Sequence, residues 1–169
     1  MSGKRSSKRK PAGRKGSEVQ VRRVPGEAAW ELLHPRCALE RSMDMEDVAA
    51  MVEAGETEIA IDELRWLLSG CSDFIQAHLV LGELALELGD IPLARGHFGH
   101  AYRVGAAAIR KAKNVRPVPY SKPANQHFFQ SGKGLAYCLK QLDKHKMASE
   151  IVEQLLSYDP TDPLNVGKL

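Results

Sequence analysis

The chain has 169 residues, of which 43% are hydrophobic and 6% aromatic, and its formal net charge is +3. This length suits one domain with a single core and an additional tail. No run approaches the roughly 18 uncharged apolar residues of a membrane-spanning helix, and no apolar segment follows the charged N-terminus, so we expect neither a transmembrane helix nor a secretory signal. Cys37, Cys71 and Cys138 are widely spaced and form no CxxC motif, which favours free buried thiols in a reducing compartment. That compartment is expected to be the cytoplasm, with the nucleus as the alternative.

The modest net charge conceals three blocks of opposite sign. Residues 1–23 carry a charge of +8, residues 24–90 a charge of −12, and residues 91–169 a charge of +7. The net value therefore says little about which partners the protein binds.

Residues 1–23 are rich in Lys, Arg, Ser and Gly and hold almost no large apolar residue before Val19, a composition typical of a disordered tail. Three roles remain open: a solvated tail, an arm that binds nucleic acid or another polyanion, and a nuclear localisation signal. The residues expected to bind a polyanion are Lys4, Arg5, Lys8, Arg9, Lys10, Arg14 and Lys15.

Beyond the tail, apolar residues recur at spacings of three and four, which predicts helices throughout. A short capping helix with Trp30 is expected over 27–33, within a segment 24–40. The later helices are expected over 44–54, 57–68, 72–88, 90–113, 125–142 and 143–157. Asp44, Ser72, Asp90 and Asp143 are the predicted N-caps, and Gly55, Gly70 and Gly89 the predicted helix ends.

The sequence also repeats itself with a period of 34 residues. Four residues of one copy, a glycine followed by three apolar positions, recur in the next. These pairs are Gly55 and Gly89, Ala60 and Ala94, Leu64 and Phe98, and Leu67 and Ala101. A third copy carries Ala136, Asp143, Ala148, Val152 and Leu155. With Leu81-Gly82 followed by Ala94-x-x-x-Phe98 and Ala101, this pattern resembles the tetratricopeptide repeat (TPR) family.

The resemblance implies an all-α helical-repeat fold of about three helix-turn-helix units, over 41–74, 75–108 and 129–162, with an insertion at 109–128 and a tail at 163–169. The aromatic residue that the family places early in each unit is absent, because Asp44, His78 and Gly132 stand there. The capping helix and the C-terminal tail are expected to seal the two ends. The proline-rich insertion is either an overlong helix pair or a basic rim that bears Tyr120.

Motifs for catalysis or metal binding are weak. His97 and His100 are three residues apart on one helix, a spacing that could chelate a metal, but the sequence places no further ligand beside them. The segment SGKG at 131–134 lacks the preceding glycine, the following Ser or Thr and the strand of a phosphate-binding loop. We therefore expect no enzyme activity, no metal and no cofactor.

In the TPR family the first helix of each unit lines a concave groove, and the resemblance implies such a groove here. The residues predicted to line it are Met45, Val52, Gln76, Leu79, Glu83, Leu86, Glu87, Gln130, Lys133, Tyr137 and Lys140. This groove would be acidic at one end, basic at the other and apolar between. The predicted function is a non-enzymatic adaptor or scaffold that binds a mixed-charge, amphipathic protein or peptide. The alternatives are a groove filled by the chain's own tail, and a nucleic-acid-associated protein that uses the basic N-terminal tail and the basic C-terminal half.

Overall fold

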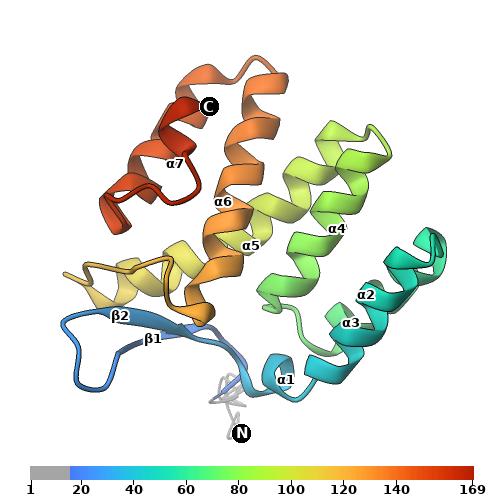
Figure 1. Ribbon diagram of the computed structural model, residues 1–169, viewed down its shortest axis with the longest axis horizontal. Helices are drawn as coiled ribbons and strands as arrows, with labels where there is room; N and C mark the ends of the chain where they lie inside the picture. The colour runs from blue at the N-terminus through green and yellow to red at the C-terminus, as the bar shows by residue number, and fades with distance from the viewer. Residues whose placement is uncertain (1–15) are drawn as a thin grey trace, which may run out of the picture.

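The helices of this protein are arranged in consecutive antiparallel pairs beside a small β-hairpin (Figure 1). The computed structural model describes residues 16–169. The hairpin consists of β1 Gln20–Arg23 and β2 Trp30–Leu33. The helices are α1 Arg36–Leu39, α2 Ser42–Glu53, α3 Thr57–Gly70, α4 Ile75–Glu87, α5 Ile91–Ala112, α6 Pro123–Gln141 and α7 His145–Tyr158, and a 3-10 turn, η1, covers Val166–Lys168. The fold is thus mostly helical, and within residues 16–169 no helix is long and apolar enough to cross a membrane.

The turns within the pairs α2–α3, α4–α5 and α6–α7 share one geometry. Their central residues, Gly55, Gly89 and Asp143, have positive φ angles of 76°, 77° and 58°. In each turn the N–H of this residue donates to the carbonyl three positions earlier, and the next N–H donates to the carbonyl five positions earlier. Glycine adopts a left-handed conformation without steric cost, and aspartate tolerates it better than most residues do. Gly55 and Gly89 therefore end helices as the sequence predicted.

The predicted N-caps are only partly correct. Asp90 caps α5, because its Oδ1 accepts the N–H of Leu93 at 3.0 Å. Asp44 lies inside the first turn of α2, and Ser72 precedes the start of α4 by three residues. Asp143 forms the left-handed turn itself rather than the cap of α7. None of these three helices has a side-chain cap hydrogen bond at its N-terminus.

The expected helix over 27–33 is wrong, and the mostly helical fold contains a two-stranded sheet that the all-α prediction did not include. Trp30–Leu33 forms β2, which pairs antiparallel with β1 so that Leu32 lies opposite Val21. Its outer side is held by tertiary hydrogen bonds, from the N–H of Trp30 to the Pro117 carbonyl and from the N–H of Leu32 to the Asn125 side chain. These partners override the local helical pattern.

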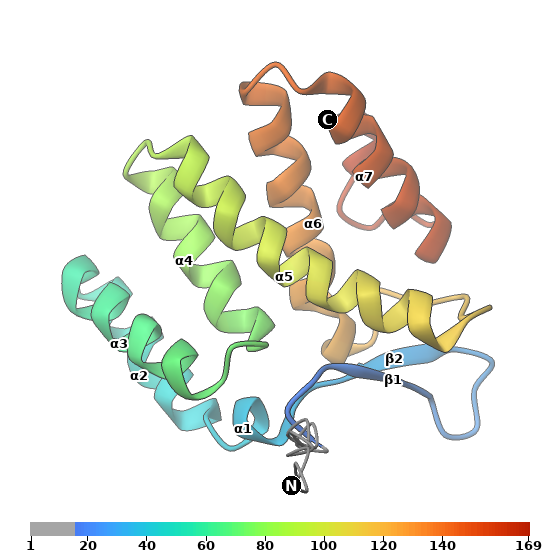
Figure 2. The same ribbon diagram turned by 180° about the vertical axis from the view of Figure 1, so that it is seen from behind.

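The apolar residues form two core clusters. One joins α1 to α4 and includes Met45, Val48, Leu64 and Phe74. The other joins the hairpin to α4 through α7. In Figure 2, which views the molecule from behind, α5 crosses in front of α4 and α6 and runs as far as the hairpin. The long α5 thereby connects the hairpin to the rest of the fold.

Two of the three cysteines are bonded to each other, which corrects the expectation of three free thiols. Cys37 on α1 and Cys71 at the end of α3 form a disulfide, with their Cα atoms 5.8 Å apart. The packing of α1 against α3 creates this proximity, which the sequence spacing does not reveal. Cys138 is free and buried, and burial raises the pKa of its thiol to about 11.

The insertion contains the end of α5, a loop over 113–122 and the start of α6. Val115 and Val118 of the loop are buried, and the N–H of Val118 donates to the Tyr158 carbonyl. Tyr120 packs edge-on against Phe129, with ring centroids 6.0 Å apart. The loop is thus packed onto α6 and α7 over much of its length.

Candidate functional site

A hollow opens between α4 and α6, which lie side by side with α5 behind them (Figure 1). The cavity has a volume of about 440 Å³. Its lining consists of Leu79, Glu83 and Leu86 from α4, Phe98 from α5, Gln130, Lys133, Gly134 and Tyr137 from α6, and Leu164 and Leu169 from the C-terminal segment. We call this hollow the α4–α6 groove.

Helical spacing explains why these side chains meet. Leu79, Glu83 and Leu86 are four and three residues apart, so they share one face of α4. Lys133 and Tyr137 share a face of α6 in the same way. The groove is therefore built from two rigid helical walls rather than from loops.

Two opposite charges flank the apolar centre of the groove. Glu83 lies on the α4 wall, where desolvation and the neighbouring Glu87 carboxylate raise its pKa. Lys133 lies half-buried on the α6 wall, and its Nζ donates to the Leu164 carbonyl at 2.9 Å. Tyr137 is 41% exposed beside it. This arrangement can hold an apolar ligand surface that carries one basic and one acidic group.

The structure brings some of the predicted lining residues together and places others elsewhere. Six of them line the groove: Leu79, Glu83, Leu86, Gln130, Lys133 and Tyr137. Gln76, Glu87 and Lys140 do not line it. Lys140 instead lines a separate hollow with Leu169.

The two predicted groove residues on α2 are placed elsewhere. Met45 is buried in the α1–α4 core, and Val52 packs against that same core. The reason is that α2 packs on α3, so its apolar face is used within its own pair. These two residues are corrected from groove residues to core residues.

Four lining residues escaped the sequence prediction. The repeat pattern places Phe98 at a core position. The structure buries this residue, but its ring also lines the floor of the groove. Gly134 leaves that floor open, since a Cβ there would lie 2.8 Å from the ring. Leu164 and Leu169 belong to a segment without periodicity, so no sequence signal placed them here. Val166 between them is buried against α7 and anchors the segment.

The two histidines of the HFGH segment meet a third histidine that the sequence analysis did not connect with them. The His78 ring lies 4.1 Å from that of His100, between centroids, and its Nδ1 is 3.4 Å from Nδ1 of His97. Burial and then the His100 charge lower the pKa of His78 to about 4, and burial also lowers that of His97. Nε2 atoms of His78 and His100 both contact the Ser72 carbonyl. Among residues 16–169, no group of three or more His, Cys, Asp or Glu side chains is arranged to hold a metal ion.

The SGKG segment lies within α6. The Ser131 hydroxyl donates to the His127 carbonyl at 2.7 Å, one turn back in the helix. The segment therefore has no free loop that could surround a phosphate group.

The predicted polyanion-binding residues lie outside the part of the chain that the structure describes. They are Lys4, Arg5, Lys8, Arg9, Lys10, Arg14 and Lys15. Their role stays a prediction.

No family model matches this chain, and neither a curated protein nor a solved structure matches it. The likeness to TPR proteins thus remains a prediction from the sequence pattern.

Proposed function

We propose that this protein is a non-enzymatic adaptor of the TPR type, which binds a peptide segment of another protein in the α4–α6 groove. The observation that carries the proposal is the meeting of two helical walls around an open apolar cavity with one acidic and one basic side chain. The three identical turns at Gly55, Gly89 and Asp143 support the helical-repeat part of the proposal.

The groove is best suited to one face of an amphipathic helix. Apolar side chains spaced by three and four residues on the ligand would contact Leu79, Leu86 and the Phe98 ring. A basic residue on the ligand would pair with Glu83, and an acidic residue with Lys133. Partial burial strengthens both pairs relative to pairs in open solvent.

Binding also involves the C-terminal segment. Lys133 already donates to the Leu164 carbonyl, so a ligand carboxylate would compete with this bond or share the ammonium group. A charge-assisted hydrogen bond to a carboxylate is stronger than one to a neutral carbonyl. We therefore expect an acidic ligand residue to contact Lys133 directly.

The test starts from a phage-displayed library of random twelve-residue peptides selected on the full-length protein. The affinity of the selected peptides is then measured by calorimetry for the wild type and for the groove variants Tyr137→Ala and Glu83→Lys. We expect each change to weaken binding about tenfold or more, because tyrosine is a frequent energetic hot spot and the Glu83 charge is reversed. A peptide whose basic residue is replaced by glutamate should recover affinity for Glu83→Lys.

The matched control is Leu93→Glu, which introduces a charge at an exposed position of α5 that does not line the groove. Circular dichroism checks that all variants keep the helicity of the wild type. Peptides that bind Tyr137→Ala and Glu83→Lys as tightly as the wild type would refute the groove as the binding site.

A further inference from the structure

β1 is an edge strand, and its outer edge carries unpaired main-chain groups. On β2, the N–H groups of Trp30 and Leu32 point away from β1, toward Pro117 and Asn125. Along an antiparallel pair, residues whose N–H and carbonyl groups point away from the partner strand alternate with residues whose groups form hydrogen bonds to it. Val21, which lies opposite Leu32, therefore directs its own N–H and carbonyl away from β2, and two residues earlier Val19 does the same. Within residues 16–169 neither has a main-chain partner outside the hairpin.

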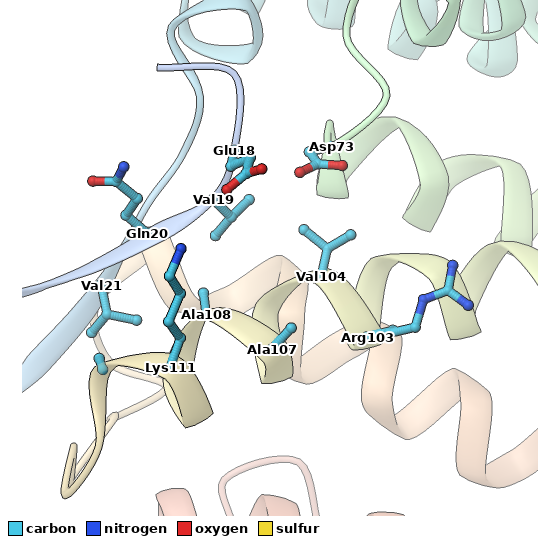
Figure 3. A pocket seen from close by; sticks show the side chains of 11 residues that line it. Glu18, Val19, Gln20, Val21, Asp73, Arg103, Val104, Ala107, Ala108 and Lys111 are labelled. Carbon is cyan, nitrogen blue, oxygen red and sulfur yellow. The ribbon is translucent and has the colours of Figure 1, made fainter. Parts of the chain in front are cut away.

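A cavity of about 560 Å³ runs along this outer edge (Figure 3). Its floor is the α5 surface formed by the small side chains of Val104, Ala107 and Ala108. The side chains of Val19 and Val21 point toward the same helix, so the apolar floor continues the inner face of β1. The space therefore lies where a third strand of the sheet would lie, at about 4.8 Å from β1.

The charges around this cavity are distributed unevenly. Glu18 and Asp73 lie close to each other at the start of β1, whereas Lys111 extends from α5 beside Gln20 and Val21 (Figure 3). Arg103, the fourth charged residue of the lining, lies elsewhere on α5 and donates to Nδ1 of His100 at 3.2 Å. Among residues 16–169 none of the three charges of Glu18, Asp73 and Lys111 takes part in an ion pair within 4.0 Å. These three remain available to a ligand with a basic group at one end and an acidic group at the other.

We propose that the outer edge of β1 and the small-residue face of α5 form a second binding site, which takes an extended peptide as an added antiparallel strand. Val19 and Val21 supply main-chain hydrogen bonds, and alternate ligand side chains of valine size rest on Ala107 and Ala108. The ligand begins with an acidic residue beside Lys111 and ends with a basic residue beside Glu18 and Asp73. This site is separate from the α4–α6 groove and does not depend on its function.

Charge complementarity defines the ligand, because an acidic ligand residue gains a partner in Lys111 and a basic one in Glu18 and Asp73. The segment that contains β1 itself runs from Glu18 to Arg22 and Arg23, so an antiparallel second copy would bring its arginines toward Glu18. A lysine beside an edge strand is one of the ways in which proteins discourage pairing between identical edges. Self-association of the chain is therefore measured as a separate outcome of the test.

The first test uses a fluorescent peptide, Glu-Thr-Val-Thr-Val-Thr-Lys, with acetylated and amidated ends. In an antiparallel strand opposite Val21, the residues whose side chains face α5 are those whose N–H groups donate to β1. N-methylation of the two valines should therefore weaken binding about tenfold or more, since each lost hydrogen bond removes roughly 1 kcal/mol. N-methylation of the threonines should leave the affinity nearly unchanged, and exchange of the terminal Glu and Lys should lower it about threefold.

The second test is Ala107→Arg, which fills the cavity from an exposed helical position. Ala50→Arg places the same side chain on an exposed position of α2 and is the matched control. Fluorescence anisotropy should show at least a tenfold weaker complex for Ala107→Arg alone, while Tyr137→Ala in the groove has no effect. Three results would overturn the proposal. The first is no binding of the wild type at about 1 mM peptide, and the second is that N-methylation of the threonines weakens binding as much as N-methylation of the valines. The third result is an unchanged affinity of Ala107→Arg for the peptide. Self-association of the wild type that Ala107→Arg abolishes would also overturn it and identify the occupant as a second copy.

Discussion

The ring of Phe98 lies where the side chain of residue 82 would begin if that residue were not glycine. A Cβ built on Gly82 would be 2.6 Å from two ring atoms of Phe98, well inside van der Waals contact. On another side of the ring, a Cβ on Gly134 would be 2.8 Å away. The ring is thus held between two glycines on α4 and α6, and it has little room to move.

Replacement of Gly82 by alanine should destabilise the protein by about 1–3 kcal/mol, because the added methyl group overpacks the core. Urea unfolding measures this change. The control is Gly96→Ala on α5, where a Cβ would meet nothing within 4 Å. There alanine should stabilise the helix by up to about 1 kcal/mol. Equal effects of the two substitutions would contradict the close packing of Phe98 against Gly82.

Asn125 should be essential for docking of the hairpin. Its side chain is fully buried, accepts the N–H of Leu32 at 2.9 Å, and donates to the carbonyls of Trp30 and Pro119 at 3.1 and 2.9 Å. Asn125→Ala leaves these buried groups unpaired, at a cost of about 2–4 kcal/mol.

Urea unfolding and amide hydrogen exchange at Leu32 measure the effect of this change. Gln141→Ala, at the exposed end of the same helix, serves as the control and should change the stability by less than about 0.5 kcal/mol. If the Leu32 amide exchanges at the wild-type rate in Asn125→Ala, the bond between them does not hold the hairpin.

Reduction of the disulfide between Cys37 and Cys71 should lower the free energy of unfolding by about 4 kcal/mol, since the bond closes a loop across 34 residues. Urea unfolding with and without reductant measures this loss, and a Cys37→Ser/Cys71→Ser double variant should be insensitive to reductant.

In the oxidised native protein the Cys138 thiol should react with a thiol reagent only after unfolding, because it is buried and its pKa is raised to about 11. Titration of three thiols without reductant would disprove the bond.

The histidine cluster predicts a loss of stability in mild acid. The pKa of His78 is lowered to about 4 in the folded protein, while in the unfolded chain it is close to 6.5. Between these values the unfolded state binds the proton that the folded state does not, so stability rises with pH across this window and falls on acidification. The lowered pKa of His97 acts in the same direction.

Thermal unfolding between pH 4 and pH 7.5 tests this prediction. His78→Gln should flatten the pH dependence, whereas His145→Gln, at an exposed position on α7, should leave it nearly unchanged. A profile for His78→Gln that parallels the wild type would exclude the cluster as its source.

The helices α2 to α7 could be predicted from the sequence to within a few residues, because their apolar spacing and turn residues are local signals. The hairpin could not be predicted in this way, although Pro25-Gly26 between two short apolar runs offered a turn signal. Its stabilising partners, Pro117 and Asn125, are far away in sequence. For the same reason the pairing of Cys37 with Cys71 was missed.

The lining of the groove could likewise be predicted only where it depends on local sequence. Helical periodicity identified the faces of α4 and α6 that carry Leu79 and Tyr137, because a face is a property of one helix. It could not say which helices lie next to each other, so Met45 on α2 was assigned to a groove that α2 does not line. The C-terminal segment with Leu164 has no periodicity at all, and only tertiary packing places it at the groove.

The 93 residues between Leu32 and Asn125 also bear on the order in which the molecule is made. Synthesis proceeds from the N-terminus, so β1 and β2 leave the ribosome long before α6, which holds them in place. The α1–α4 core, in contrast, is complete in sequence once α4 has been made. The first strands to be synthesised are therefore among the last to dock. Until then Val19 and Leu32 stay exposed, and the nascent chain presents an open strand edge to its surroundings.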